Sequence, residues 1–121
     1  MTSAQSLAES VFKTVDAMQP EAFAQFLAED GAFIFGNMPA AKGRAAVAGA
    51  VKQFFGSISG IKHHIAGVWQ EGDTVTVELE VSYTRKDGKV VTLPCANIWK
   101  LNQQDKISDY RIFMDVNPVF A

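Results

Sequence analysis

The sequence predicts one α+β domain in which N-terminal helices pack on a strongly curved, mainly antiparallel sheet and enclose a pocket. Its 121 residues suit a single domain covering residues 1–121. Apolar residues follow helical spacing in the first half, whereas apolar and polar residues alternate as in strands in the second half. Because the helices come first, they cannot be crossovers between parallel strands, and long twisted strands curl. Nine phenylalanines add large rings that can line a cavity as well as fill a core.

Three helices are expected in the first half. Their expected ranges are 3–18, 20–30 and 44–58, with a short strand at 32–36 and a loop at 36–43 before the third. Ser6 and Glu9 match a capping box, although the first helix can also begin one turn earlier. Pro20 suits the first position of the second helix, and Gly31 ends it because glycine readily takes the left-handed conformation.

The second half is expected to form an antiparallel meander of four strands. Their expected ranges are 61–69, 74–85, 90–101 and 106–115. The second of these alternates most clearly between apolar and polar residues, which predicts one dry face and one wet face. Asp87 and Gly88 follow it and suit a hairpin turn, because both residues tolerate positive φ angles.

Charge and composition exclude several partners. The formal net charge is −2 and there is no basic cluster, so we expect no nucleic acid partner. The longest apolar stretches are far shorter than the ~20 residues that cross a bilayer, so we expect no membrane partner. The N-terminus lacks the pattern of a signal peptide, and the single Cys95 cannot form an internal disulfide. We therefore expect a cytoplasmic protein.

The order of elements, together with three segments, resembles the nuclear transport factor 2-like superfamily and, within it, the SnoaL-like group. The three segments are 29–33, 43–47 and 106–115. The resemblance implies a cone-shaped, cystatin-like α+β roll. The superfamily includes polyketide cyclases, ketosteroid isomerase, limonene epoxide hydrolase, scytalone dehydratase and members without known activity. The fold alone cannot choose among these activities, so the site must.

Asn97 is the polar residue that the pattern places inside. One parity of the third strand of the meander is bulkier and more apolar, and we expect it to face the interior. Leaving a buried amide unpaired costs about 1–3 kcal/mol, so either the protein or a ligand must bond to Asn97. When the chain is aligned with ketosteroid isomerase as the resemblance implies, Asn97 takes the place of the protonated aspartate in the oxyanion hole of that enzyme. An amide can donate a similar hydrogen bond.

The same register argues against two activities of the superfamily. Phe35 falls where the isomerase has its general base, and Val11 falls near its oxyanion tyrosine. Neither side chain can do that chemistry. Epoxide hydrolase chemistry needs a carboxylate inside the last strand, where this chain has Ile112. Asp109 and Arg111 share the outer face of that strand and are expected to form a surface or interface ion pair.

His64 and Asp115 are the candidate proton-transfer residues. His63 and His64 point to opposite faces of a strand, so they cannot chelate one metal ion, and we expect neither a metal nor another cofactor. One of the two faces inward, and the SnoaL-like pattern favours His64, with a structural histidine as the alternative. SnoaL-like sequences often carry an aspartate at the position of Asp115; the alternative is a strand-end cap or a partner for Arg111.

Further side chains are expected to contact a ligand. The expected ligand-binding set is Asn37, Tyr83, Phe35, Trp99, Met114 and Tyr110. Tyr83 is placed at the mouth of the pocket, where its hydroxyl can donate. Asn37 lies in a loop that we expect to border the opening, and it is either a ligand contact or a turn former. The apolar members are either pocket lining or ordinary core.

Two functions from different classes remain open. The first is an isomerase-, cyclase- or dehydratase-type enzyme that acts on a small apolar carbonyl or polyketide-like compound. The second is a non-catalytic ligand-binding or dimerisation module whose own side chains fill the pocket. A void of ~300 Å³ or more, with Asn97 and a titratable group beside it, favours the first function.

A homodimer is expected from the outer face of the sheet. Pro94, Ala96 and Ile98 lie on that face, opposite the helices. An exposed apolar sheet face usually finds a partner.

Overall fold

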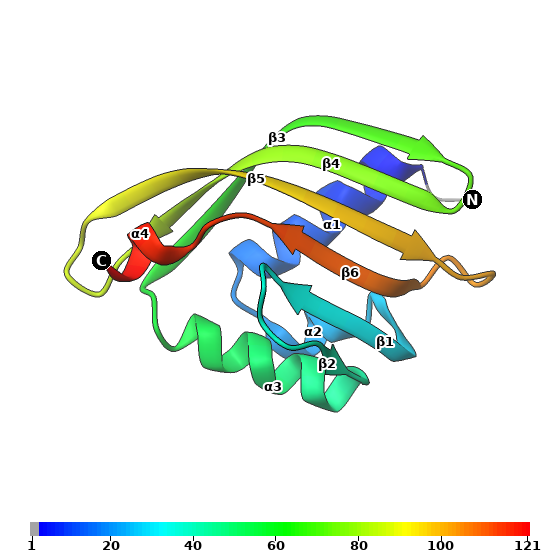
Figure 1. The fold of residues 1–121 in the computed structure, drawn as a ribbon, viewed down its shortest axis with the longest axis horizontal. Helices are drawn as coiled ribbons and strands as arrows, with labels where there is room; N and C mark the ends of the chain where they lie inside the picture. Colours follow the sequence, from blue (N-terminus) through cyan, green and yellow to red (C-terminus); the bar gives the residue numbers. More distant parts are fainter. Residues whose placement is uncertain (1–2) are drawn as a thin grey trace.

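The computed structural model describes residues 3–121, and in this range it contains four helices and one six-stranded sheet (Figure 1). The helices are α1 (Ala4–Asp16), α2 (Pro20–Ala24), α3 (Arg44–Phe55) and α4 (Asn117–Phe120). The strands are β1 (Leu27–Phe35), β2 (Ala41–Lys42), β3 (Gly60–Glu71), β4 (Thr74–Thr84), β5 (Val90–Leu101) and β6 (Ile107–Phe113). Strand β2 and helix α4 were not predicted, because two- and four-residue elements leave little periodicity to detect.

The first helix begins at the earlier of the two expected positions. Ser3 is its N-cap, and the Ser3 side chain accepts a hydrogen bond from the backbone N–H of Ser6 at 3.1 Å. Its buried face carries Ala8, Val11, Phe12 and Val15.

The expected second helix is too long by six residues. Helix α2 ends at Ala24, and the chain then enters β1 at Leu27. Leu27 pairs with Ile107 of β6, and the backbone N–H of Ile107 donates to the carbonyl of Phe26 at 2.9 Å. These pairings with a strand some 80 residues away are tertiary contacts, and they override local helical spacing. The third helix also ends three residues early, at Phe55.

The sheet curls over the helices, with strand order β2-β1-β6-β5-β4-β3 (Figure 1). Strands β3 to β6 form the predicted antiparallel meander, whereas β1 runs parallel to β6, so the sheet is mixed. Helix α1 packs against β3, and α2 and α3 pack on each other below β1. None of the helices in residues 3–121 is long and apolar enough to cross a membrane.

The dry face of β4 is the centre of the core, as its alternation predicted. Val75, Val77, Leu79, Val81 and Tyr83 are at most 2 % exposed. Their polar neighbours in the chain lie on the outer face. This parity therefore fixes which side chains point toward the hollow beneath the sheet.

We predict opposite effects of alanine at two glycines. A Cβ on Gly31 would lie 3.0 Å from the backbone oxygens of Ala28 and Ile107, whereas a Cβ on Gly49 would meet nothing within 4 Å. Gly31→Ala should lower the free energy of unfolding by about 1–3 kcal/mol, because backbone must move to make room. Gly49→Ala, in the interior of α3, should raise it by about 0.5–1 kcal/mol. Urea unfolding measures both, and a neutral Gly31→Ala would contradict the predicted close approach.

Candidate functional site

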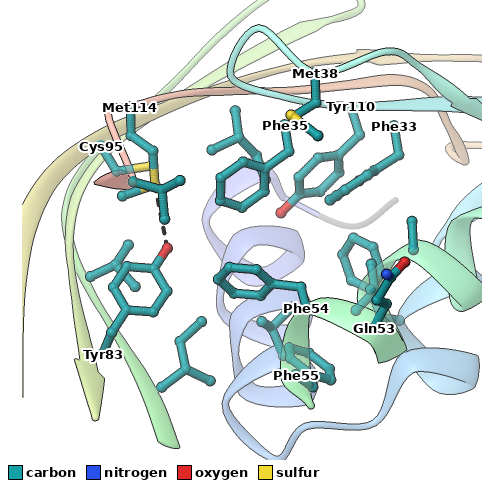
Figure 2. Close-up of a pocket in the computed structure, with 18 of the residues that line it drawn as sticks. Phe33, Phe35, Met38, Gln53, Phe54, Phe55, Tyr83, Cys95, Tyr110 and Met114 are labelled. Atoms are coloured by element: carbon teal, nitrogen blue, oxygen red, sulfur yellow. Dashed lines mark hydrogen bonds between the residues drawn. The ribbon is translucent and has the colours of Figure 1, made fainter. Parts of the chain in front are cut away.

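A cavity of about 560 Å³ lies between the concave face of the sheet and α3. Figure 2 shows aromatic rings around it from β1, α3, β4 and β6. These rings belong to Phe33, Phe35, Phe54, Phe55, Tyr83 and Tyr110. Met38 and Phe120 also line the cavity, and both are more than half exposed, so the cavity opens between the loop after β1 and helix α4.

The lining contains few polar groups and no Asp, Glu, Lys or Arg of the described residues. The polar lining side chains are Gln53, Ser57, His63, Tyr83, Asn97 and Tyr110, besides the thiol of Cys95. Burying an unpaired charge is costly. The cavity therefore suits an uncharged, mostly apolar molecule with a few oriented hydrogen bonds.

His63 and Asp16 form a close pair at the cavity wall. The Nδ1 atom of His63 lies 2.6 Å from Oδ1 of Asp16, and the two side chains are 9 % and 17 % exposed. The same carboxylate accepts the backbone N–H of His63 at 3.1 and 3.2 Å. The ring of Phe12 stacks on the imidazole at 4.5 Å, with the planes 12° apart. Helix α1, through its last residue, therefore fixes both the backbone and the ring of His63.

The Asp16 contact determines what His63 can do. A carboxylate accepts hydrogen bonds, so the neutral imidazole carries its proton on Nδ1 and keeps a lone pair on Nε2. Within residues 3–121, Nε2 of His63 has no hydrogen-bond partner. Every fully buried side-chain nitrogen or oxygen in this range has such a partner, so Nε2 is not fully buried. Nε2 is therefore accessible, and a histidine in this arrangement can act as a general base.

The inward histidine is His63, so the orientation favoured for His64 is wrong. His64 is exposed on the outer face, with Nε2 3.4 Å from Oγ of Ser82. The resemblance favoured His64, whereas the alternation of β3 places His63 on the inner face with Ile61 and Ile65, before the register shift between Ile65 and Gly67. No group of three His, Cys, Asp or Glu side chains within the described part of the chain is placed to hold a metal ion.

Asp16 was missed in the sequence. It follows Phe12 by four residues, so it continues the buried face of α1. An acidic residue in that position needs a buried partner, and this was the signal that could have identified it.

Asn97 lies inside, at 2 % exposure, and lines the cavity. Its Oδ1 accepts a hydrogen bond from the indole N–H of Trp99 at 3.2 Å, and its Nδ2 donates to Sγ of Cys95 at 3.5 Å. Trp99 was expected to line the cavity. It is instead completely buried behind the wall, because its ring packs between Phe12 and Tyr110.

The other predicted lining residues on the sheet line the cavity, although Tyr83 is buried, at 2 % exposure, and does not lie at the mouth as expected. Phe35, Tyr83, Met114 and Tyr110 all line the cavity, and the hydroxyl of Tyr83 donates to Sδ of Met114 at 3.3 Å (Figure 2). The hydroxyl of Tyr110 points into the cavity. Burial raises the pKa of both tyrosines above the ordinary value, and the nearby Cys95 adds to this. Both hydroxyls therefore keep their protons and can donate.

Asp115 and Asn37 lie outside the cavity lining. Asp115 is exposed, and its Oδ1 accepts the backbone N–H of Asn117 at 3.1 Å, which is the capping role left open as an alternative. Arg111 pairs instead with Asp109 at 2.8 Å, as predicted. Asn37 is exposed in the turn after β1, and the next residue, Met38, reaches the cavity in its place.

Comparisons with known proteins agree with this fold. A family profile described as a SnoaL-like domain matches residues 8–110. No curated protein sequence matches the chain.

Solved structures share the fold at low sequence identity. A hypothetical protein with a ketosteroid isomerase-like fold from Catenulispora acidiphila, in complex with trimethylamine, has a TM-score of 0.87 and 17 % identity over 97 % of this chain and 91 % of that one. A protein named as a SnoaL-like polyketide cyclase, from Jannaschia sp. CCS1, has a TM-score of 0.76 and 17 % identity over 94 % of this chain and 88 % of that one. SalBIII, an epoxide hydrolase/cyclase-like enzyme of salinomycin pyran ring formation, has a TM-score of 0.79 and 17 % identity over 94 % of this chain and 92 % of that one.

We predict that Cys95 is unreactive in the folded protein. Burial raises the pKa of its thiol to about 12, although the hydrogen bond from Asn97 acts in the other direction. The reactive thiolate is therefore scarce below that pH. With Ellman's reagent at pH 8, labelling should be about 100-fold or more slower in the native protein than in urea. Rapid native labelling at pH 8 would show that the cavity wall around Cys95 is open.

Proposed function

The chain belongs to the SnoaL-like domain family, and from this premise we propose that it is an enzyme acting on a small, uncharged, mostly apolar carbonyl compound. In this proposal, His63 removes a proton from the carbon beside the carbonyl group. The observation that carries the proposal is the 2.6 Å contact between Asp16 and His63 at the wall of an apolar cavity. An acid that orients a histidine is a recurrent way to prepare a general base.

The reaction can be written from the residues present. Nε2 of His63 accepts the proton, the electron pair of the C–H bond forms a C=C bond, and the carbonyl oxygen becomes an enolate oxygen. Asn97 and Tyr110 can donate hydrogen bonds to that oxygen. In a β,γ-unsaturated ketone the enolate is conjugated with the second C=C bond, and return of the proton from His63 to the γ-carbon gives an isomerisation. In a β-hydroxy ketone the enolate re-forms the C=O bond, a C=C bond forms between the α- and β-carbons, and the hydroxide leaves with the proton from His63 as water, which is a dehydration. Neither outcome needs a cofactor.

The cavity supports a ligand-binding function over the self-filled module. Its volume of about 560 Å³ is within the ~300–1,000 Å³ typical of ligand sites. A polyketide cyclase-like protein and an epoxide hydrolase/cyclase-like enzyme share the fold, which is consistent with small organic substrates. His64 and Asp115 have no part in the proposed reaction, because both side chains are exposed outside the cavity.

We predict that the protein catalyses exchange of α-protons. Small apolar ketones such as 1-indanone and 2-tetralone, first selected as binders by thermal shift, would be incubated in D₂O and followed by NMR. His63→Gln should slow the exchange by about 10²- to 10⁴-fold, because the base is lost. Asp16→Asn should slow it less, because only the orientation of the ring is disturbed.

The adjacent histidine supplies the matched control. His64→Gln changes the same residue type one position away on the outer face and should leave the exchange rate unchanged. Equal rates in the wild type and His63→Gln would refute the base role of His63. Binding of ketones with no exchange by any variant would favour the non-catalytic ligand-binding module.

We further propose a cytoplasmic homodimer that pairs through the outer face of the sheet. Ala96 of β5 lies beside Phe113 of β6 in the register, with Ile98 next along β5, and Phe113 is 49 % exposed. Burying this apolar patch favours association. In sedimentation experiments the wild type should exceed the 13.2 kDa of one chain, and Ile98→Asp should shift it to the monomer. A wild type that sediments only as a monomer contradicts this pairing.

A further inference from the structure

Asn97 carries the one buried side-chain amide within residues 3–121, and the two ends of this amide have different partners. The oxygen end contacts the indole N–H of Trp99, and the nitrogen end contacts the sulfur of Cys95. An indole N–H can only donate a hydrogen bond. The side-chain amide therefore has one orientation in which its oxygen is satisfied, and turning it over would set an N–H against an N–H.

Trp99 is itself held firmly. It is completely buried, it stacks on Tyr110 with ring centroids 5.0 Å apart, and the ring centroid of Phe12 lies 5.7 Å from that of the indole. A rigid indole gives the Asn97 oxygen a fixed partner, so the amide nitrogen is also fixed.

The amide nitrogen has hydrogen-bonding capacity left over. It carries two hydrogens. The one partner found for it within residues 3–121 is the sulfur of Cys95, at the long distance of 3.5 Å, and sulfur is a weak acceptor. Because Asn97 lines the cavity, the second hydrogen can be used by a bound molecule.

A second donor lies beside Asn97. Asn97 pairs with Ile112 of β6, and Tyr110, two residues before Ile112, is on the same inner face. The Tyr110 hydroxyl points into the cavity and keeps its proton, because burial raises its pKa well above the ordinary value, although a hydrogen bond from Trp99 acts in the other direction. The indole N–H of Trp99 therefore lies close to both Asn97 and Tyr110. This part of the wall therefore offers an N–H and an O–H to a ligand and hides the amide oxygen.

We infer that Trp99 is a positioning residue that holds the Asn97 amide as a donor, so that this wall selects uncharged ligands carrying a hydrogen-bond acceptor, such as a carbonyl oxygen, over ligands carrying an N–H donor. The inference rests on the proposed function only in treating the cavity as the binding site. It does not require His63 to transfer a proton.

Three rigid, flat probes of nearly equal shape test this selection. 9-Fluorenone presents an acceptor, fluorene presents neither donor nor acceptor, and carbazole presents an N–H donor. Calorimetric titration of the wild type should give fluorenone an affinity about tenfold above that of fluorene, the effect of one good hydrogen bond. Carbazole should bind more weakly than fluorenone, because its N–H would meet the N–H of Asn97 and the O–H of Tyr110 at this wall.

Two variants test whether Trp99 and Asn97 cause this ligand selectivity. Trp99→Phe keeps a ring but removes the donor, so the amide can turn; the fluorenone-to-carbazole ratio should fall about tenfold or more toward equality. Asn97→Leu should reduce the preference for fluorenone over fluorene, because the Tyr110 hydroxyl is then the donor that remains at this wall. Trp69→Phe is the matched control, because Trp69 is 57 % exposed and does not line the cavity, and it should leave all three affinities unchanged.

A measurement on the wild type covers the case in which Trp99→Phe does not fold. Fluorenone should shift the side-chain amide resonances of Asn97 in ¹H–¹⁵N spectra. The indole N–H of Trp99 should keep the chemical shift of a hydrogen-bonded group. Equal wild-type affinity for fluorenone and carbazole would overturn the inference, as would an unchanged ratio in folded Trp99→Phe or the absence of binding by all three probes. Selective binding without ketone exchange would refute the base role alone, whereas exchange without selective binding would refute this inference alone.

Discussion

Strict alternation of side chains along a curled sheet is the constraint on which the cavity depends. On β4 and β5 every second residue faces the concave side, and the curl keeps those side chains from closing the hollow by themselves. Helix α3 supplies Phe54 and Phe55 from below, but rings at this spacing still leave room. The result is a dry interior in which each of the few polar groups has a defined direction.

Polar groups in this interior are oriented by neighbours outside the cavity lining. Asp16 directs the imidazole of His63 from the end of α1, and Trp99 directs the amide of Asn97 from behind β5. Phe12 links His63 and Trp99, because its ring stacks on the imidazole and lies tilted beside the indole. Mutations of these supporting residues should therefore alter chemistry or selectivity without touching a ligand.

The strands could be predicted from sequence because their signal is local. The alternation of β4 and the turn at Asp87 and Gly88 predicted the meander, and the bulkier parity of β5 predicted the inward position of Asn97. The parallel pairing of β1 with β6 could not be predicted, since it joins residues some 80 positions apart and replaces a helix that local spacing favoured. The pairing of Asp16 with His63 could not be predicted for a similar reason, because the two residues meet only when α1 docks on β3. The resemblance favoured His64, whereas the alternation of Ile61, His63 and Ile65 in β3 places His63 on the inner face.

The Asp16 carboxylate also affects how copies of the chain can meet. Strand β3 ends the sheet on one side, and an open edge is a template on which another chain can add. Asp16 already occupies the outward backbone N–H of His63, and the irregularity before Gly67 interrupts the ladder. The opposite edge is β2, only two residues long. Both edges are therefore poor templates for fibril-like growth, and association is directed to the faces of the sheet.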